Sequence, residues 1–216
     1  MKKAIFFDLD GTLWDALSQI TTSWNLTMKK YHYPYRFDLE TVKSIMGLTP
    51  EETCQLLFKD KDLKEGLDIF HLLVKEEINY LSKHPGTIYE NEDKVLSALS
   101  AKYDLYVVSN SDKGYIENYL STCNKEKYFN GHICAGDLGL AKWQNILYLK
   151  EKEQIDEVIY VGDTLKDKIE SEKADVKFIH AAYGFGKINN DTIKINNLTE
   201  LILKVEEVFV ENAQKK

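Results

Sequence analysis

The chain has 216 residues, of which 44% are hydrophobic and 29% are charged, as in ordinary globular proteins. This length suits one sizeable α/β domain, or a core domain with a smaller insertion. The 35 acidic and 28 basic side chains give a formal net charge of −7, which disfavours nucleic acid as a general partner. Any anionic ligand must then be held by a local group of donors.

The cysteines and the hydropathy exclude other classes of protein. Cys54, Cys123 and Cys134 are widely spaced and form no Cys-x-x-Cys pair, so the chain resembles neither a disulfide framework nor a zinc protein. No stretch of sequence approaches the roughly 20 apolar residues of a membrane-spanning helix. We therefore expect a reduced, cytoplasmic protein with no membrane partner. The residues predict no oligomeric state.

The first predicted element is a buried strand from Lys3 to Phe7, which runs into two carboxylates one residue apart. Alternation along a strand puts Asp8 and Asp10 on the same side, so that both can face one reacting centre. Gly11-Thr12 supplies the turn that ends the strand. A calcium loop of the EF-hand type is excluded, because the glycine comes at the fourth position and the twelfth position is Gln19.

Residues from about 15 to 84 carry apolar side chains at helical spacing, and Thr49-Pro50 is a good helix start. Four helices do not pack easily as a single crossover between strands, which indicates a separate lobe. We predict an all-helical cap domain at residues 15–84, and a catalytic core formed by residues 1–14 and 85–216. The predicted helices are Ile20–Tyr31, Leu39–Met46, Glu51–Phe58 and Ile69–Leu81.

After the helical segment, short β-branched or aromatic runs alternate with amphipathic stretches. This alternation predicts an α/β fold with a parallel sheet of five or six strands. Open sheets of this kind bind ligands at the carboxyl ends of their strands, so the active site is expected there, between the two lobes. The further predicted strands are Leu105–Ser109, His132–Ala135, Val158–Val161, Lys177–Ala181 and a weaker one near Thr192–Ile195.

Two of these strand ends carry side chains that suit a phosphate and a metal ion. Ser109 and Asn110 offer a hydroxyl and an amide for phosphoryl oxygens, although Ser109 is also a common helix-capping residue. Asp163 and Asp167 are four residues apart, on one face of a new helix turn. Oxygen-rich ligation indicates Mg²⁺. The plainer alternative is a capping role for Asp163 and a solvated charge at Asp167.

Lys142 lies just before another amphipathic helix and is the weakest of these signals, because lysine is common in helices. A fixed cation is nevertheless needed where a carboxylate approaches a phosphate, since the two repel each other.

Taken in order, these motifs resemble the haloacid dehalogenase superfamily: Asp8–Thr12, Ser109–Asn110, Lys142, and Gly162–Asp163 with Asp167. The resemblance covers the whole chain. It implies a Rossmann-type parallel core, and the helical insert after the first strand looks like the C1 cap of that family. Each motif alone is common, whereas their order is specific.

The resemblance implies a role for each acidic residue. Asp8 would be the nucleophile that forms an aspartyl-phosphate, and Asp10 would protonate the leaving oxygen and then activate water. Mg²⁺ would be held by Asp8, by the backbone carbonyl of Asp10 and by Asp163, with Asp167 as a direct or an indirect ligand.

The resemblance also implies that Ser109, Asn110 and Lys142 grip the transferring phosphoryl group. Pro85-Gly86-Thr87 resembles the branch that contains phosphoglycolate phosphatase and β-phosphoglucomutase. The expected function is therefore a Mg²⁺-dependent phosphatase for a small phosphorylated metabolite, similar to phosphoglycolate phosphatase.

Alternatives remain at this point. A phosphosugar mutase similar to β-phosphoglucomutase would use the same aspartyl-phosphate, and a non-catalytic binding protein could retain the fold. A true dehalogenase is disfavoured, because departure of a halide needs no general acid and Asp10 would have little to do. A phosphorylation-receiver domain would lack the helical insert.

Overall fold

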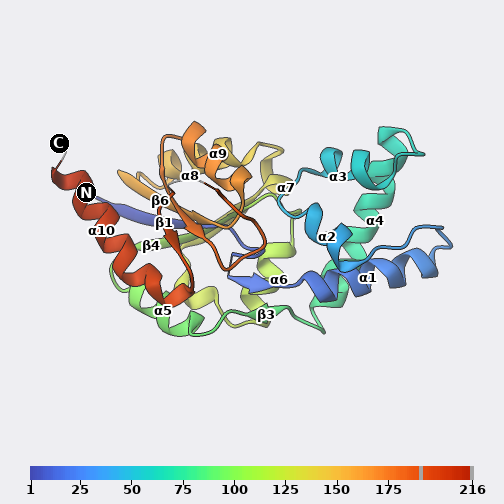
Figure 1. The fold of residues 1–216 in the computed structure, drawn as a ribbon, viewed down its shortest axis with the longest axis horizontal. Coiled ribbons are helices and arrows are strands. Elements are labelled where there is room, and N and C mark those ends of the chain that lie inside the picture. The colour runs from blue at the N-terminus through green and yellow to red at the C-terminus, as the bar shows by residue number, and fades with distance from the viewer. Residues whose placement is uncertain (190–191, 215–216) are drawn as a thin grey trace.

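A six-stranded parallel sheet forms the centre of the protein in the computed structural model, which describes residues 1–189 and 192–214 (Figure 1). The strand order is β5-β4-β1-β6-β7-β8, and each neighbouring pair is parallel. This sheet confirms the predicted α/β fold. The strands are β1 Lys3–Phe7, β4 Asp104–Ser109, β5 Gly131–Cys134, β6 Glu157–Gly162, β7 Lys177–Ala181 and β8 Lys194–Ile195.

Helices cover both faces of the sheet, because alternate residues of its strands point to opposite sides. Ile5 and Phe7 belong to the apolar cluster under α5, α6 and α10, whereas Ala4 and Phe6 belong to the cluster under α8 and α9. The bounds are α5 Glu92–Ser100, α6 Tyr115–Thr122, α7 Ala135–Leu138, α8 Lys142–Lys152, α9 Leu165–Lys173 and α10 Leu201–Gln214, with short 3₁₀ turns at Glu126–Tyr128 and Leu198–Glu200.

Four further helices pack against one another at one end of the molecule, and we call them the insert helices (Figure 1). The last of them begins six residues before its predicted start at Ile69. Asp62 stabilises this earlier start, because its carboxylate accepts a hydrogen bond of 2.8 Å from the Glu65 backbone N–H. The insert helices are α1 Leu17–Lys30, α2 Leu39–Ser44, α3 Pro50–Leu57 and α4 Leu63–Leu81.

A two-stranded antiparallel pair joins the segments that lead into and out of the insert helices. It consists of β2 Trp14–Asp15 and β3 Thr87–Ile88. The sequence does not predict this pair, because a strand of two residues has no measurable period. The pair places both connections side by side. The division into a core and a cap domain stays a prediction.

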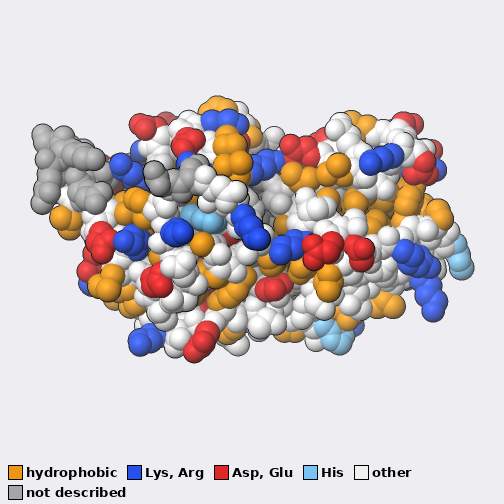
Figure 2. All heavy atoms as spheres, viewed as in Figure 1, with side chains coloured by type: hydrophobic (Ala, Val, Ile, Leu, Met, Phe, Trp, Pro, Cys, Tyr) orange, Lys and Arg blue, Asp and Glu red, His pale blue; other side chains and the backbone are white. Residues whose placement is uncertain are grey.

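The surface of the face shown in Figure 2 carries acidic and basic side chains of both signs, interspersed rather than gathered by sign. Among the residues that the structure describes, no helix combines the length and the apolar character needed to cross a membrane.

Candidate active site

Three of the predicted site residues meet at the carboxyl edge of the sheet. Asp8 follows β1, Ser109 ends β4 and Asp163 follows β6. Since β1 lies between β4 and β6, these side chains come from adjacent strands. Asp8 is held by its backbone as well, because its N–H donates to the Val161 carbonyl over 2.8 Å. The edge predicted from the topology is therefore the edge where these residues gather.

Lys142, the first residue of α8, bridges two of the carboxylates. Its Nζ donates to Asp8 Oδ1 over 2.7 Å and to Asp167 Oδ1 over 2.6 Å, and all three side chains are buried. Burial opposes the charge of Lys142, but Asp167 and Asp8 hold the pKa of its ammonium group well above the usual range. Lys142 thus stays a fixed cation beside the predicted nucleophile.

Asp167 has a second task at the start of α9. Its Oδ2 accepts hydrogen bonds from the backbone N–H and the hydroxyl of Thr164, at 3.0 and 2.6 Å, and Thr164 is the N-cap residue of the helix. The capping alternative for Asp163 is therefore wrong. So is the alternative of a solvated charge at Asp167, which is only 2% exposed.

The carboxylate of Asp163 is held by a glycine-rich loop. Its Oδ2 accepts hydrogen bonds from the backbone N–H groups of Phe185 and Gly186, at 2.6 and 3.3 Å. Any side chain at Gly184 would clash with Asp163, so only glycine lets this loop approach so closely. The other oxygen, Oδ1, is buried and has no hydrogen-bond partner among the described residues. A buried carboxylate oxygen left in this way suits a cation.

The residues present fit a divalent cation. One carboxylate oxygen each from Asp8, Asp163 and Asp167 lies within 4.8 Å of the others. Burial raises the pKa of Asp8 well above its usual range and that of Asp163 to about 7, and Asp167 adds to both shifts. When all three are ionised, the carboxylates outnumber the single charge of Lys142, and a hard cation, which prefers oxygen ligands, would offset that excess. The Asp10 carboxylate is not part of this cluster, and the metal-binding role of its carbonyl stays a prediction.

Asp10 lines the same cavity as Asp8, but the two residues do not alternate along one strand as predicted from the sequence. The strand ends at Phe7, and Asp10 is positioned by a turn in which the Gly11 N–H donates to the Trp14 carbonyl over 2.9 Å. The Asp10 Oδ1 atom accepts hydrogen bonds from the Tyr115 hydroxyl at 2.7 Å and from Trp14 Nε1 at 3.2 Å. Burial raises the pKa of Asp10 to about 6, against these hydrogen bonds.

Ser109 and Asn110 also line this cavity, as the phosphate prediction requires. The Ser109 hydroxyl accepts a hydrogen bond of 3.2 Å from the Ser111 N–H, and the next helix begins only at Tyr115. The capping alternative for Ser109 is therefore wrong. The Asn110 side chain donates to the Gly47 carbonyl over 2.9 Å, which links the sheet edge to the insert helices.

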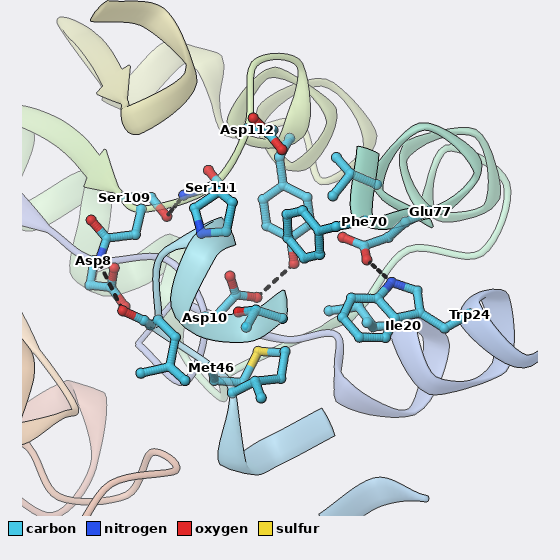
Figure 3. A pocket seen from close by; sticks show the side chains of 18 residues that line it. Asp8, Asp10, Ile20, Trp24, Met46, Phe70, Glu77, Ser109, Ser111 and Asp112 are labelled. Carbon is cyan, nitrogen blue, oxygen red and sulfur yellow. Dashed lines mark hydrogen bonds between the residues drawn. The ribbon is translucent and has the colours of Figure 1, made fainter. Parts of the chain in front are cut away.

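The cavity itself measures about 90 Å³ and lies between the sheet edge and the insert helices. Figure 3 shows Asp8 and Ser109 toward one end and Glu77 with Trp24 at the other, with Asp10 between them. Glu77 and Tyr115 are site residues that were not predicted from the sequence. Glu77 could have been found from the sequence, because it is a charged residue in a row of otherwise apolar residues spaced four apart on α4. Nothing in the sequence distinguishes Tyr115, since a tyrosine in a helix usually packs in the core.

The substitution Tyr115→Phe is expected to lower kcat about tenfold with little change in KM, because Asp10 loses its shorter hydrogen bond. Tyr119→Phe is the matched control, since Tyr119 lies on the same helix and its hydroxyl donates to Glu92. Steady-state kinetics of both variants checks this. An equal fall of kcat in Tyr115→Phe and Tyr119→Phe would mean that Tyr115 affects activity only through the stability of the fold.

Fold and site together define a class of α/β proteins with a buried carboxylate cluster at the sheet edge. Residues 5–181 match the haloacid dehalogenase-like hydrolases, and the chain belongs to this family. The chain is 28% identical over 199 residues to a phosphoglycolate phosphatase of Aquifex aeolicus, with 87% of this chain and 88% of that protein covered. It is 23% identical over 180 residues to a phosphorylated carbohydrates phosphatase of Thermotoga maritima, with 80% and 81% covered.

A solved structure has the same fold. The haloacid dehalogenase-like family hydrolase from Streptococcus pneumoniae has a TM-score of 0.78 at 22% identity, over 94% of this chain and 97% of that chain. The predicted family and hydrolase class are thereby confirmed. Both named relatives are phosphatases, which agrees with the predicted class of phosphoric monoester hydrolase.

Proposed function

We propose that this protein is a Mg²⁺-dependent phosphatase, similar to phosphoglycolate phosphatase, that hydrolyses a small phosphorylated metabolite through an aspartyl-phosphate on Asp8. The observation that carries the proposal is the pairing of buried Asp8 with Lys142 at 2.7 Å, together with a cavity that both Asp8 and Asp10 line. The names of the relatives support the same class of reaction.

The reaction would proceed in two displacements. In the first, a carboxylate oxygen of Asp8 attacks phosphorus while the ester P–O bond breaks and Asp10 gives its proton to the leaving oxygen. In the second, Asp10 takes a proton from water, the water oxygen attacks phosphorus and the bond to Asp8 breaks. A pKa of about 6 lets Asp10 act as acid and as base near neutral pH.

The phosphoryl group would be held by side chains of the same edge. Lys142 is positioned to offset the charge that builds up as the carboxylate meets the phosphoryl oxygens. Ser109 and Asn110 would donate hydrogen bonds to those oxygens, because the Asn110 amide has a second N–H besides the one that donates to Gly47.

A Mg²⁺ ion would be held by the carboxylates of Asp8, Asp163 and Asp167, with the Asp10 carbonyl as the further ligand that the family resemblance implies. When bound, the ion would neutralise negative charge on the phosphoryl oxygens. The unpartnered Oδ1 of Asp163 supports this assignment.

Removal of metal tests the proposal. Purified protein treated with EDTA is expected to release no phosphate from a panel of small phosphomonoesters, and addition of Mg²⁺ is expected to restore release. Phosphate is measured by a colorimetric assay. Release that persists in EDTA would contradict the metal requirement, and no release from any compound with Mg²⁺ would contradict the phosphatase.

The phosphosugar mutase stays the alternative prediction. Isomerisation of β-glucose 1-phosphate without net phosphate release, in the same assay, would favour it. A cytoplasmic location is part of the proposal and is supported by the three cysteines, all of which are free thiols. Cell fractionation tests that location.

A further inference from the structure

Glu77 is a buried carboxyl group that the proposed mechanism leaves without a task. It is 5% exposed and continues the buried row of Ile69, Leu73 and Leu81 on α4, where an apolar residue would be expected. Its Oε2 accepts a hydrogen bond from the Trp24 indole N–H, which orients the carboxyl group. A buried polar group in an apolar row costs stability, so a function is the natural reason for its presence.

Glu77 lies where the leaving group of a substrate would be. In Figure 3 it occupies the end of the cavity opposite Asp8, and Asp10 lies between them. The phosphoryl group belongs at Asp8 and the bridging oxygen at Asp10, so the rest of the substrate points toward Glu77. The cavity volume of about 90 Å³ has room for several water molecules, and hence for a leaving group of a few carbon atoms.

The walls of the cavity beyond Asp8 and Asp10 are apolar and acidic. Ile20, Phe70 and Val74 supply apolar surface, and Asp112 adds a further carboxylate. Among the described residues that line the cavity, none is a lysine, an arginine or a histidine. A leaving group with a carboxylate of its own would therefore lose its water without meeting a cation, which is costly.

The charge state of Glu77 leads to the same expectation. Burial raises its pKa to about 8, and Asp10 and Asp112 add to the shift. A protonated Glu77 has one hydrogen to donate, which does not replace the hydration of a carboxylate. In either state an oxygen of Glu77 can accept a hydrogen bond from a ligand.

We propose that Glu77 is a specificity-determining residue that accepts a hydrogen bond from a hydroxyl or ammonium group on the leaving group of the substrate, and that the cavity disfavours leaving groups with a carboxylate. This inference rests on the proposed phosphatase activity and names its substrate class: it keeps the reaction that the protein would share with phosphoglycolate phosphatase but not phosphoglycolate as the preferred substrate. A site built to bind a donor discriminates strongly against an analogue that lacks it.

Four phosphomonoesters with two-carbon leaving groups test the inference at a constant number of carbon atoms. 2-Hydroxyethyl phosphate carries a hydroxyl, 2-aminoethyl phosphate an ammonium, phosphoglycolate a carboxylate, and ethyl phosphate no polar group. With Mg²⁺ present, we expect kcat/KM for the hydroxyl or the ammonium compound to exceed that for phosphoglycolate and for ethyl phosphate at least about tenfold. Whichever of the two donors is preferred identifies the donor.

Variants connect that preference to the residue. Glu77→Gln keeps the size of the side chain, and we expect it to shift the ratio of kcat/KM between the preferred donor and phosphoglycolate about tenfold toward phosphoglycolate. Glu76→Gln is the control, because the carboxylate of the neighbouring Glu76 forms an ion pair of 2.8 Å with Lys30 and does not line the cavity. The ratios of kcat/KM measured for this variant should match those of the wild type. Thermal melting establishes that both variants are folded.

The outcomes separate the two proposals. Phosphoglycolate turned over as well as the donor compounds, or ratios unmoved in Glu77→Gln, would overturn the role of Glu77 and leave the phosphatase intact. Release of phosphate from none of the four compounds would overturn the inference, and the phosphatase would be contradicted as well only if the wider panel of phosphomonoesters also released none. If Glu77→Gln fails to fold, the ranking of the four compounds by the wild-type protein still decides the question of leaving-group charge.

Discussion

Asp8→Asn is expected to abolish phosphate release, with kcat lowered at least about 10⁴-fold, because the amide that replaces the carboxylate is a far weaker nucleophile. The remaining groups that hold the phosphoryl group stay in place, so substrate is still expected to bind. Steady-state release of phosphate measures the loss. Mass spectrometry of protein quenched in acid during turnover should detect an added phosphoryl group on Asp8 in the wild type and none in the variant.

The stability of this variant separates chemistry from folding. Burial and the neighbouring Asp167 and Asp163 raise the pKa of Asp8, so its charged form is unfavourable in the folded protein despite Lys142. Asparagine removes that repulsion, and Lys142 keeps its hydrogen bond of 2.6 Å to Asp167. We therefore expect the melting temperature to be maintained or raised while activity is lost.

Asp68→Asn, on the exposed surface of α4, is the matched control and should behave like the wild type in both measurements. An Asp8→Asn protein that is folded and retains more than about a hundredth of the wild-type kcat would contradict the role of Asp8 as nucleophile.

Buried parallel strands were the elements most open to prediction. β1 has the bounds predicted from sequence, Lys3 to Phe7, because a strand covered on both faces of the sheet contains a continuous apolar run, here Ala4 to Phe7. The site residues that follow these strands could also be predicted, because the carboxyl ends of parallel strands share one edge of the sheet. Asp8 and Asp163 lie close together because each follows one of two neighbouring parallel strands, β1 and β6.

Contacts made by tertiary packing could not be predicted in the same way. Lys142 follows an ordinary helix pattern, and nothing in that pattern shows that its ammonium group reaches both Asp8 and Asp167. The hydrogen bond from Tyr115 to Asp10 joins residues 105 positions apart and depends on how α6 packs. Glu77 differs, because a charged residue in a buried i, i+4 row is itself a signal.

Glu77→Gln is expected to make the protein more stable, and more so as the pH rises from about 5 to about 8. The pKa of Glu77 is raised from its ordinary 4.5 to about 8 by burial, with Asp10 and Asp112 adding to the shift and the hydrogen bond from Trp24 opposing it. Between these pH values the folded protein keeps a proton that the unfolded chain has released. Stability therefore falls as pH rises through this range, and the loss is complete above about pH 8.

Glutamine carries no such proton, so the variant loses this part of the pH dependence. One group contributes on the order of 1 kcal/mol per pH unit, which sums to a few kcal/mol over the range and corresponds to a rise in melting temperature of several degrees near pH 8. Thermal or urea unfolding of wild type and Glu77→Gln at a series of pH values measures the difference. Glu76→Gln removes only the ion pair with Lys30, so this variant should show no increase in stability over the wild type that grows with pH.

A difference between Glu77→Gln and wild type that is constant with pH would mean that Glu77 is ionised in the folded protein throughout. The cavity would then hold a permanent negative charge opposite Asp8, which favours an ammonium group over a hydroxyl on the leaving group. A difference that grows with pH instead means that the cavity holds a neutral acid, whose carbonyl oxygen can accept a hydrogen bond from a hydroxyl or an ammonium group but gives the ammonium no ion pair. The unfolding experiment thus bears on the choice between the two donors without any substrate.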